Sequence, residues 1–364
     1  MRPSTVSLAP FIMIKETKHR QGGRQDPQTT TAMDSLRLSL RADYWVIDEQ
    51  GRLEEPDRVA GLPGADATDS PYSLAVETPP CADCGDLRRE LVDRLRSTVS
   101  AAHNRGCRLL ALGIRPDLLV DGPRLPDGEP PPVATASTRV VFEPEPGAAA
   151  DCYNTLVALD PAFVLINTTC RVDGDQRYAC GRPSLIHGGP TGRYRTTDEA
   201  PPDAEPTEPT PEVPVSRSDR DPPGAASTDH QPVAWLDGGS RIEWRSLDAS
   251  APTLLVDLLA DVTEILREAT HRRLRVESFG NGFHGDRLVL PSTAWQAIYT
   301  EAAIREGLSS LLVRAYLERF GIETGWYRAA ARSAAEPAST ADIPALCRRR
   351  ATDLEADIGV PPLA

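Results

Sequence analysis

Lysine is almost absent from this 364-residue chain and occurs only at Lys15 and Lys18. Every fixed cationic side chain after residue 18 is therefore an arginine. This excludes a lysine Schiff base and a lysine-dependent phosphate loop from the rest of the chain, because both need a primary amine. The arginine bias, together with the excess of acidic residues, predicts a protein adapted to high salt and encoded by GC-rich DNA.

Long hydrophobic runs are also missing. No apolar stretch reaches the length needed to cross a bilayer, and the N-terminus lacks the sustained apolar segment and cleavage site of a secretion signal. We therefore expect a cytoplasmic protein. Residues 1–32 are expected to form a disordered extension, or to reflect the choice of start codon, since Met33 directly precedes a strand-like pattern.

Cysteines are few for the length of the chain, and their number is odd. Seven scattered cysteines argue against a disulfide framework. Cys81 and Cys84 form a single Cys-x-x-Cys motif at a predicted helix start, without the second pair that a zinc site needs. Packing is the default interpretation, and a zinc or redox role is the alternative. The cysteines are Cys81, Cys84, Cys107, Cys152, Cys170, Cys180 and Cys347.

The net charge of the chain indicates which classes of partner are not expected. The formal net charge is −13 and the isoelectric point is near 5.0. A field of this sign repels nucleic acids and anionic membranes, so we expect neither as a partner. The hydrophobic fraction of 40% predicts a folded core, and the length allows one large domain or two small ones.

Periodicity predicts several elements. Leucines at four-residue spacing indicate a helix over 86–105, and the apolar pattern after Pro252 indicates another over 252–269. Further helices are predicted from about 151, over 292–305, over 309–320 and over 340–358. Strands are predicted at 36–47, 72–77, 108–114, 138–143 and 240–245, and 274–277 with 287–290 is expected to form a hairpin.

Strands come early in the chain and helices late, which predicts an α+β fold with a mostly antiparallel sheet flanked by helices. Residues 190–232 are dominated by Pro, Asp, Glu, Thr and Ser, which predicts a disordered insertion. The expected organisation is an extension (1–32), the first part of one domain (33–189), the insertion (190–232), and the second part with the C-terminal helices (233–364).

Six segments together resemble the glutamate–cysteine ligase family of the bacterial and archaeal type, including its carboxylate–amine ligase branch. Their order and spacing carry the resemblance, and no single one decides it. The segments are Ser39–Asp48 with Gly51, Glu77–Cys81, Leu110–Pro116, Ala158–Ala162 with Asn167, Glu243–Ser246 and Glu306–Ser310. The resemblance implies a curved, glutamine-synthetase-like sheet whose concave face holds ATP, Mg²⁺ and an amino-acid substrate.

The chain departs from this family at positions that handle metal and phosphate. Where the family has three glutamates, this sequence has Arg41, Ala42 and Asp43. Arginine stands in place of histidine at Arg115, and the family's His-x-His is Arg139-Val140-Val141. An arginine cannot lose its proton to become a ligand, and a like charge about 4 Å from a cation costs on the order of 4 kcal/mol at an effective dielectric near 20.

The resemblance assigns roles to the positions that match. Asp43, Glu77 and Glu243 are the candidate metal ligands. Arg245 is the candidate catalytic residue and would hold a carboxylate or phosphate. Asn167, Arg115, Arg139 and Arg245 are the candidate substrate- or nucleotide-binding residues. The alternative for each of these residues is a purely structural role, as a surface carboxylate or as a member of an ion pair.

Two hypotheses follow. The first is an ATP- and Mg²⁺-dependent ligase that joins a glutamate-like carboxylate to an amine, with an amino acid and a nucleotide as small-molecule partners. The second is a catalytically inactive relative without a cofactor that binds an anionic small molecule or a partner protein. Arg41, Arg115 and Arg139 would then form an anion-binding cluster, unless each is simply paired to an acid. A homo-oligomer is compatible with both.

Overall fold

The structure of the chain is a computed structural model. It describes residues 36–56, 65–68, 70, 72–115, 135–145, 147–167, 169–173, 176–186, 194, 231–236, 239–278, 280–332 and 343–363. The predicted extension at 1–32 and nearly all of the predicted insertion at 190–232 lie outside these residues. Both predicted parts of the domain, before and after the insertion, contribute strands to one sheet.

A seven-stranded sheet organises the molecule, with the strand order β2-β3-β1-β5-β9-β8 and β4 paired to β1. The pairings are antiparallel throughout. The predicted α+β class with a mostly antiparallel sheet is therefore confirmed. The strands are β1 (Arg37–Asp48), β2 (Ala65–Ala67), β3 (Ser73–Glu77), β4 (Cys107–Leu110), β5 (Ser137–Glu143), β8 (Val233–Leu236) and β9 (Arg241–Asp248).

Strand β1 shows how the sequence distributes its side chains between the two faces of this sheet. Alternate residues point to opposite faces of a strand. The even-numbered residues from Leu38 to Val46 are buried and belong to the main core cluster. The odd-numbered residues from Arg37 to Asp43 are polar and partly or fully exposed, whereas Trp45 and Ile47 on that same face are buried in a second cluster.

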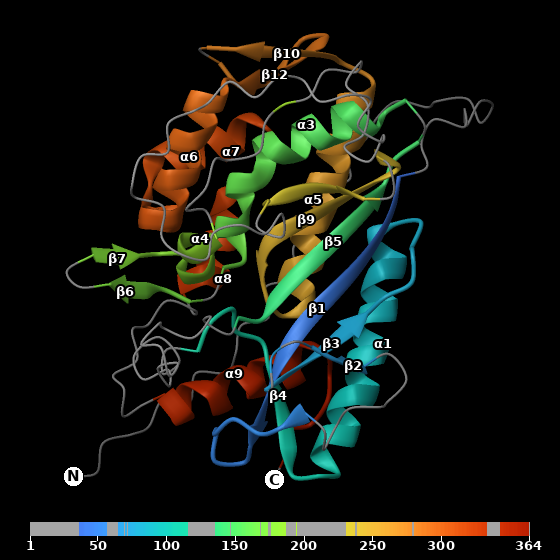
Figure 1. The fold of residues 1–364 in the computed structure, drawn as a ribbon, viewed down its shortest axis with the longest axis vertical. Coiled ribbons are helices and arrows are strands. Elements are labelled where there is room, and N and C mark those ends of the chain that lie inside the picture. Colours follow the sequence, from blue (N-terminus) through green and yellow to red (C-terminus); the bar gives the residue numbers. More distant parts are fainter. Residues whose placement is uncertain are drawn as a thin grey trace, which may run out of the picture.

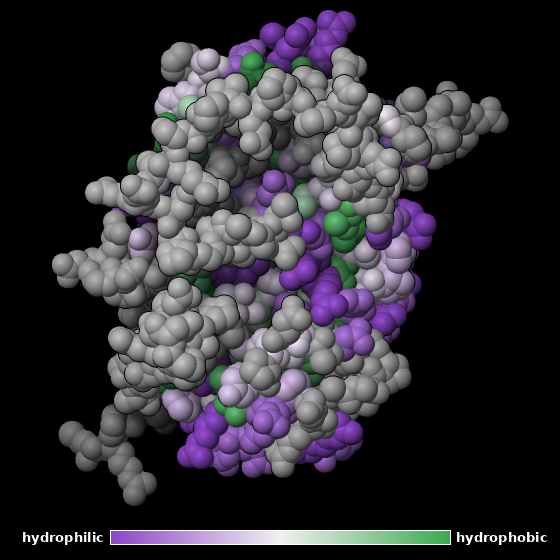
Figure 2. Space-filling model, viewed as in Figure 1, coloured by the Kyte–Doolittle hydropathy of each residue, from purple (hydrophilic) through white to green (hydrophobic). Residues whose placement is uncertain are grey.

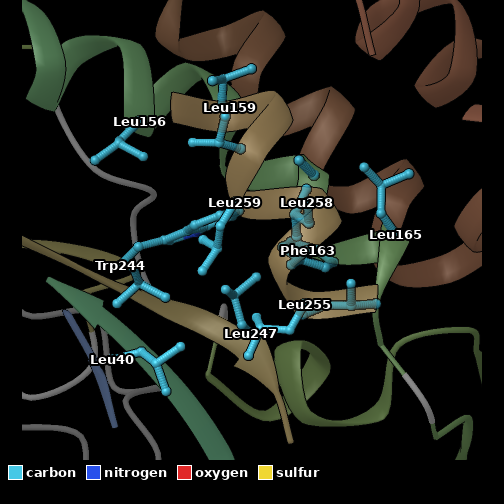
Figure 3. Packing of buried hydrophobic residues seen from close by; sticks show 14 of the residues in the cluster. Leu40, Leu156, Leu159, Phe163, Leu165, Trp244, Leu247, Leu255, Leu258 and Leu259 are labelled. Carbon is cyan, nitrogen blue, oxygen red and sulfur yellow. The ribbon is translucent and has the colours of Figure 1, made fainter. Parts of the chain in front are cut away.

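Helices cover the apolar face. They are α1 (Cys84–His103), α3 (Ala149–Leu159) and α5 (Pro252–Thr270), and α3 is followed by a 3₁₀ turn, η2 (Asp160–Leu165). Helix α1 contacts β1, β3 and β4, and α3 contacts β8 and β9. Figure 3 shows Trp244 and Leu247 of β9 among leucines of α5 and α3, so the strand residues of this face and the helices form one core.

Helix α9 (Ile343–Asp357) covers the other face at one end. Its residues Ile343, Cys347 and Ala351 pack against Trp45 and Ile47, which explains why the odd-numbered face of β1 becomes apolar there. The polar part of this face therefore ends where α9 begins to cover it. Figure 1 shows α9 lying across the sheet near β4.

An ionic network fixes α9 in place. Glu355 is fully buried and accepts two hydrogen bonds from Arg108 of β4, at 2.8 and 2.6 Å. The ring of His103 lies 2.9 Å from the same carboxylate. Gly51, in the turn after β1, has a φ of +85°, and a Cβ there would meet the Pro344 carbonyl at 2.4 Å. The start of α9 thus requires glycine at this turn.

A second sheet of three strands has the order β10-β12-β11. Its strands are β10 (Arg273–Glu277), β11 (Gly282–His284) and β12 (Arg287–Pro291). The expected hairpin of 274–277 with 287–290 is wrong, because β10 and β12 are parallel and β11 pairs antiparallel with β12. The glycine-rich turn contains its own short strand, which the sequence pattern did not separate from the loop.

The remaining elements are short or lie toward the C-terminus. Helices α6, α7 and α8 lie together on one side of the molecule in Figure 1. Among the residues that the structure describes, none of the helices combines the length and apolar character needed to span a bilayer. These elements are β6 (Arg171–Asp173), β7 (Gln176–Tyr178), α4 (Gly181–Ile186), α6 (Thr293–Glu306), η5 (Gly307–Ser309), α7 (Leu311–Arg319) and α8 (Thr324–Arg332).

Candidate functional site

The polar face of the seven-stranded sheet brings together most of the residues singled out in the sequence. Antiparallel partners point to the same face of a sheet. Arg41 of β1 is the direct partner of Glu77 on β3 and of Arg139 on β5. Glu243 of β9 is paired with Val141 of β5, two residues after Arg139. In Figure 2 hydrophilic atoms lie in the middle of the view, where β1, β3 and β5 run in Figure 1.

Arg41 occupies the centre of the acidic positions. Its Nη1 lies 2.5 Å from Glu77 Oε1, and its Nε lies 3.8 Å from Asp43 Oδ1. The Arg41 side chain is 36% exposed, so it lies along the face and does not extend into solvent. Two of the three candidate metal ligands therefore already face a fixed positive charge.

Asp43 is nearly as enclosed as Glu243, with side chains that are 13% and 11% exposed. It accepts hydrogen bonds from the backbone N–H and the hydroxyl of Ser137, at 3.3 and 2.9 Å. Burial raises the pKa of the Asp43 carboxyl above its ordinary value, and the bonds from Ser137 and the charges of Arg41 and Arg139 oppose that rise. The neighbours of Asp43 thus act mainly to hold its ionised form.

The third candidate ligand, Glu243, is paired in the same way. Its Oε2 forms an ion pair with Nε of Arg245, two residues along the same face of β9. The two side chains are 11% and 17% exposed. Arg245, the candidate catalytic residue, is therefore engaged with a carboxylate of this chain.

A β-bulge places Arg139 beside this pair. Thr138 pairs with Leu247 and Val140 with Trp244, so Arg139 lies opposite the two residues Arg245 and Ser246. Arg41, Arg139 and Arg245 consequently form a row across three neighbouring strands, β1, β5 and β9. Arg139 is exposed, and no hydrogen bond or ion pair links it to any part of the chain that the structure describes.

Arg182 of α4 supports the end of β9 and was not singled out in the sequence. It is 6% exposed and donates to the carbonyl oxygens of Arg245 and Leu247, at 2.8 and 3.1 Å. Burial lowers its pKa, while the charges of Asp248 and Asp43 oppose that shift. No local pattern marks it, because α4 has six residues and no periodicity.

Asn167 and Arg115 lie at the end of the sheet, away from the row of arginines. Asn167 Oδ1 accepts a hydrogen bond from the Asp248 N–H at 3.3 Å. Arg115 is 3% exposed and donates to the Gly51 carbonyl at 3.2 Å, in the turn after β1. The structure therefore brings Arg41 and Arg139 together, whereas Arg115 anchors a turn.

These residues do not fit a magnesium ion as they are arranged. Mg²⁺ requires free carboxylate oxygens in near-octahedral geometry, and all three candidate carboxylates have an arginine nitrogen within 4 Å. Glu77 and Glu243 are also separated by two intervening strands, or about 14 Å at a spacing near 4.8 Å. Within the described ranges, no group of three or more His, Cys, Asp or Glu side chains could hold a metal.

The Cys-x-x-Cys motif lies elsewhere. The Cys81 thiol is buried and donates to the Pro79 carbonyl, and the Cys84 thiol lies 3.8 Å from the Thr263 hydroxyl. Burial is the largest cause that raises the pKa of both thiols. Neither is therefore activated as a thiolate.

Comparison with known proteins gives similarities of structure only. No model of a known protein family matches the chain, and no curated protein sequence matches it either. The bifunctional glutathione synthetase of Pasteurella multocida superposes with a TM-score of 0.47 at 10% identity, over 90% of this chain and 53% of that chain. The glutamate–cysteine ligase of Francisella tularensis in complex with AMP gives 0.41 at 11% identity, over 89% and 83%.

The ligase PafA, solved with the prokaryotic ubiquitin-like protein Pup, superposes with a TM-score of 0.43 at 9% identity. That alignment covers 90% of this chain and 65% of PafA. The chain therefore spans about half of the glutathione synthetase and just under two thirds of PafA. Similarity at these scores is one of structure and assigns no function to the chain.

Proposed function

We propose that the chain is a divergent relative of the ATP-dependent carboxylate–amine ligases in which the polar face of the sheet binds a small anionic molecule without a divalent metal. The curved sheet of the glutamine-synthetase-like ligases would correspond to the seven-stranded sheet, and its active face to the polar face. The observation that carries the proposal is the row of Arg41, Arg139 and Arg245 on three neighbouring strands.

Repulsion between the positive charges of the row favours an anionic ligand. Like charges directly opposite each other in a sheet are destabilising, yet Arg41 and Arg139 are direct partners. Arg41 is balanced by Asp43 and Glu77, and Arg245 by Glu243. Arg139 forms no ion pair with any described residue, although its charge acts on Asp43, so an anionic ligand would relieve its repulsion from Arg41.

The geometry suits phosphate or carboxylate. A guanidinium presents its N–H donors in a planar fork that can hold either group through two parallel hydrogen bonds. Neighbouring strands lie about 4.8 Å apart, so adjacent arginines of the row can contact two oxygens of one anion. Arg139 would make the primary contact, and Arg41 and Arg245 would contribute without leaving their acids.

A matched pair of variants tests this proposal. Arg139→Ala removes the central donor, and Arg287→Ala removes another exposed strand arginine, on β12, that has no partner among the described residues. Calorimetry with inorganic phosphate in the presence of EDTA should show saturable binding to the wild type and to Arg287→Ala. Arg139→Ala should lose about tenfold or more in affinity, corresponding to about 1.4 kcal/mol. Equal binding by all three proteins would overturn the assignment.

The second candidate function is an active ATP- and Mg²⁺-dependent ligase of the glutamate–cysteine ligase type. One observation favours it: Asp43, Glu77 and Glu243 all stand on the same face of the same sheet. Substrate binding would then have to displace Arg41 from Glu77. Its test is ADP release from ATP in the presence of Mg²⁺, glutamate and cysteine, with Glu77→Gln as the variant that should lose activity.

A further inference from the structure

Strand β10 forms an edge of the three-stranded sheet. It pairs with β12 alone among the described residues, and it is the terminal strand in the order β10-β12-β11. Figure 1 places β10 at the top of the molecule, at the far end from α9, and Figure 2 shows hydrophilic atoms at that end. An edge strand of this kind presents backbone donors and acceptors that can pair with another chain.

The register shows which backbone groups are available. The Arg273 N–H donates to Asp286 and the Glu277 carbonyl accepts from Ser292, so the odd-numbered residues of β10 direct their backbone groups toward β12. In a parallel ladder the alternate residues point the other way. Leu274 and Val276 therefore present their N–H and C=O groups to the outer edge, and no described residue pairs with them there.

The side chains of β10 discriminate between partners. Arg273, Arg275 and Glu277 are all exposed, and Val276 is 54% exposed. Charged edge strands ordinarily prevent edge-to-edge association. Association remains favourable only for a strand whose charges are opposite at each facing position, and the sequence of β10 itself meets this condition in one register.

We propose that two copies of this chain associate through β10 in an antiparallel arrangement centred on Val276. A twofold axis through this residue makes Val276 face Val276 of the partner subunit as a hydrogen-bonded pair, which matches its outward backbone groups. Arg275 then faces Glu277 of the partner subunit, and the reverse pair forms by symmetry. These are the closer, non-hydrogen-bonded positions, where opposite charges stabilise most.

The neighbouring registers are rejected by charge. Centring the axis on Arg275 would place Arg275 against Arg275 of the partner subunit, a like-charge contact that offsets part of the attraction of the two flanking Arg273–Glu277 pairs. Centring it on Glu277 would place two glutamates together. Registers offset by a single residue would direct the outward backbone groups of one strand at inward groups of the other. The pairing on Val276 thus satisfies both the backbone and the charges, and it covers an exposed valine.

The contact is short, so the dimer should depend on concentration. A five-residue edge buries less surface than the roughly 1,200–2,000 Å² of standard stable interfaces. Sedimentation equilibrium of the full chain from 1 to several hundred micromolar should therefore show a reversible monomer–dimer equilibrium. A wild type that is monomeric over this whole range contradicts the proposal.

Two kinds of variant assign the dimer to this edge. Val276→Pro removes the outward N–H without touching the ladder to β12, a position where an edge strand tolerates proline. It should leave far-ultraviolet circular dichroism unchanged and abolish the dimer. Arg287→Glu, on β12 of the same sheet but away from the edge, is the matched control and should leave the dimerisation constant unchanged.

Charge-reversal variants of β10 test the register of the proposed pairing. Arg275→Glu or Glu277→Arg alone creates two like-charge pairs and should raise the dissociation constant by about tenfold or more at low ionic strength. The double variant Arg275→Glu/Glu277→Arg should restore the wild-type constant. A dimer that is insensitive to Val276→Pro, or a double variant weaker than either single one, places the interface elsewhere. The anion-binding test is independent, since none of these residues lies on the polar face.

Discussion

The two faces of strand β1 differ in the interactions that their side chains make. On one face, residues such as Leu40 and Tyr44 are buried against the helices, and their contribution is the removal of apolar surface from water. On the other face, Arg41 and Asp43 are held by ion pairs and hydrogen bonds that leave them partly exposed. We therefore expect the apolar face to contribute most of the stability of the fold, and the side chains of the polar face to be available for a ligand.

The largest expected effect comes from the apolar face. Leu40 is 2% exposed, so Leu40→Ala should lower the free energy of unfolding by about 2–5 kcal/mol through lost burial and a residual cavity. Ser39→Ala, the adjacent residue on the polar face, should change it by less than about 0.5 kcal/mol. Urea unfolding of both variants measures the difference. Equal effects would mean that the assignment of the two faces is wrong.

An intermediate effect is expected where the polar face is enclosed. Arg245→Ala leaves the Glu243 carboxylate, which is 11% exposed, without its ion pair, and should lower the free energy of unfolding by about 1–3 kcal/mol. Glu243→Gln/Arg245→Ala should recover part of this loss, because no unpaired charge then remains. If the double variant is less stable than the single one, the pair is not the source of the effect.

A smaller effect is expected at the exposed pair. The side chains of Arg41 and Glu77 are 36% and 45% exposed, so solvent screens their attraction. Arg41→Ala should change the free energy of unfolding by less than about 1 kcal/mol in urea titration. The salt dependence of stability should also be weaker in this variant. A loss of several kcal/mol would show that Arg41 supports the fold and is not primarily a binding residue.

Much of the fold could be predicted from local sequence patterns. Helices α1, α5 and α6 and strands β1, β3, β5 and β9 each have a periodicity or a capping residue within their own segment. The short elements β2, β6, β7 and α4 have none that is long enough to recognise, whereas the nine-residue helix α8 is amphipathic and was missed. The parallel pairing of β10 with β12 was not predictable from the pattern, because strand direction depends on the chain path and not on composition.

The candidate site was predictable as a set of positions but not as a set of contacts. Alternation along β1 and β9 places Arg41, Asp43, Glu243 and Arg245 on one face. The pairing of Arg41 with Glu77 depends on the register between strands separated by a long loop, which the sequence does not reveal. Arg182 reaches β9 only through tertiary packing.

In the proposed function, arginine side chains and not a metal ion supply the positive charge of the polar face. The most direct test is the affinity of the wild-type protein for inorganic phosphate, measured by calorimetry once in EDTA and once in excess Mg²⁺ at matched ionic strength. Equal dissociation constants under the two conditions are the predicted result. Binding that occurs only with Mg²⁺ would contradict the proposed metal-independent function.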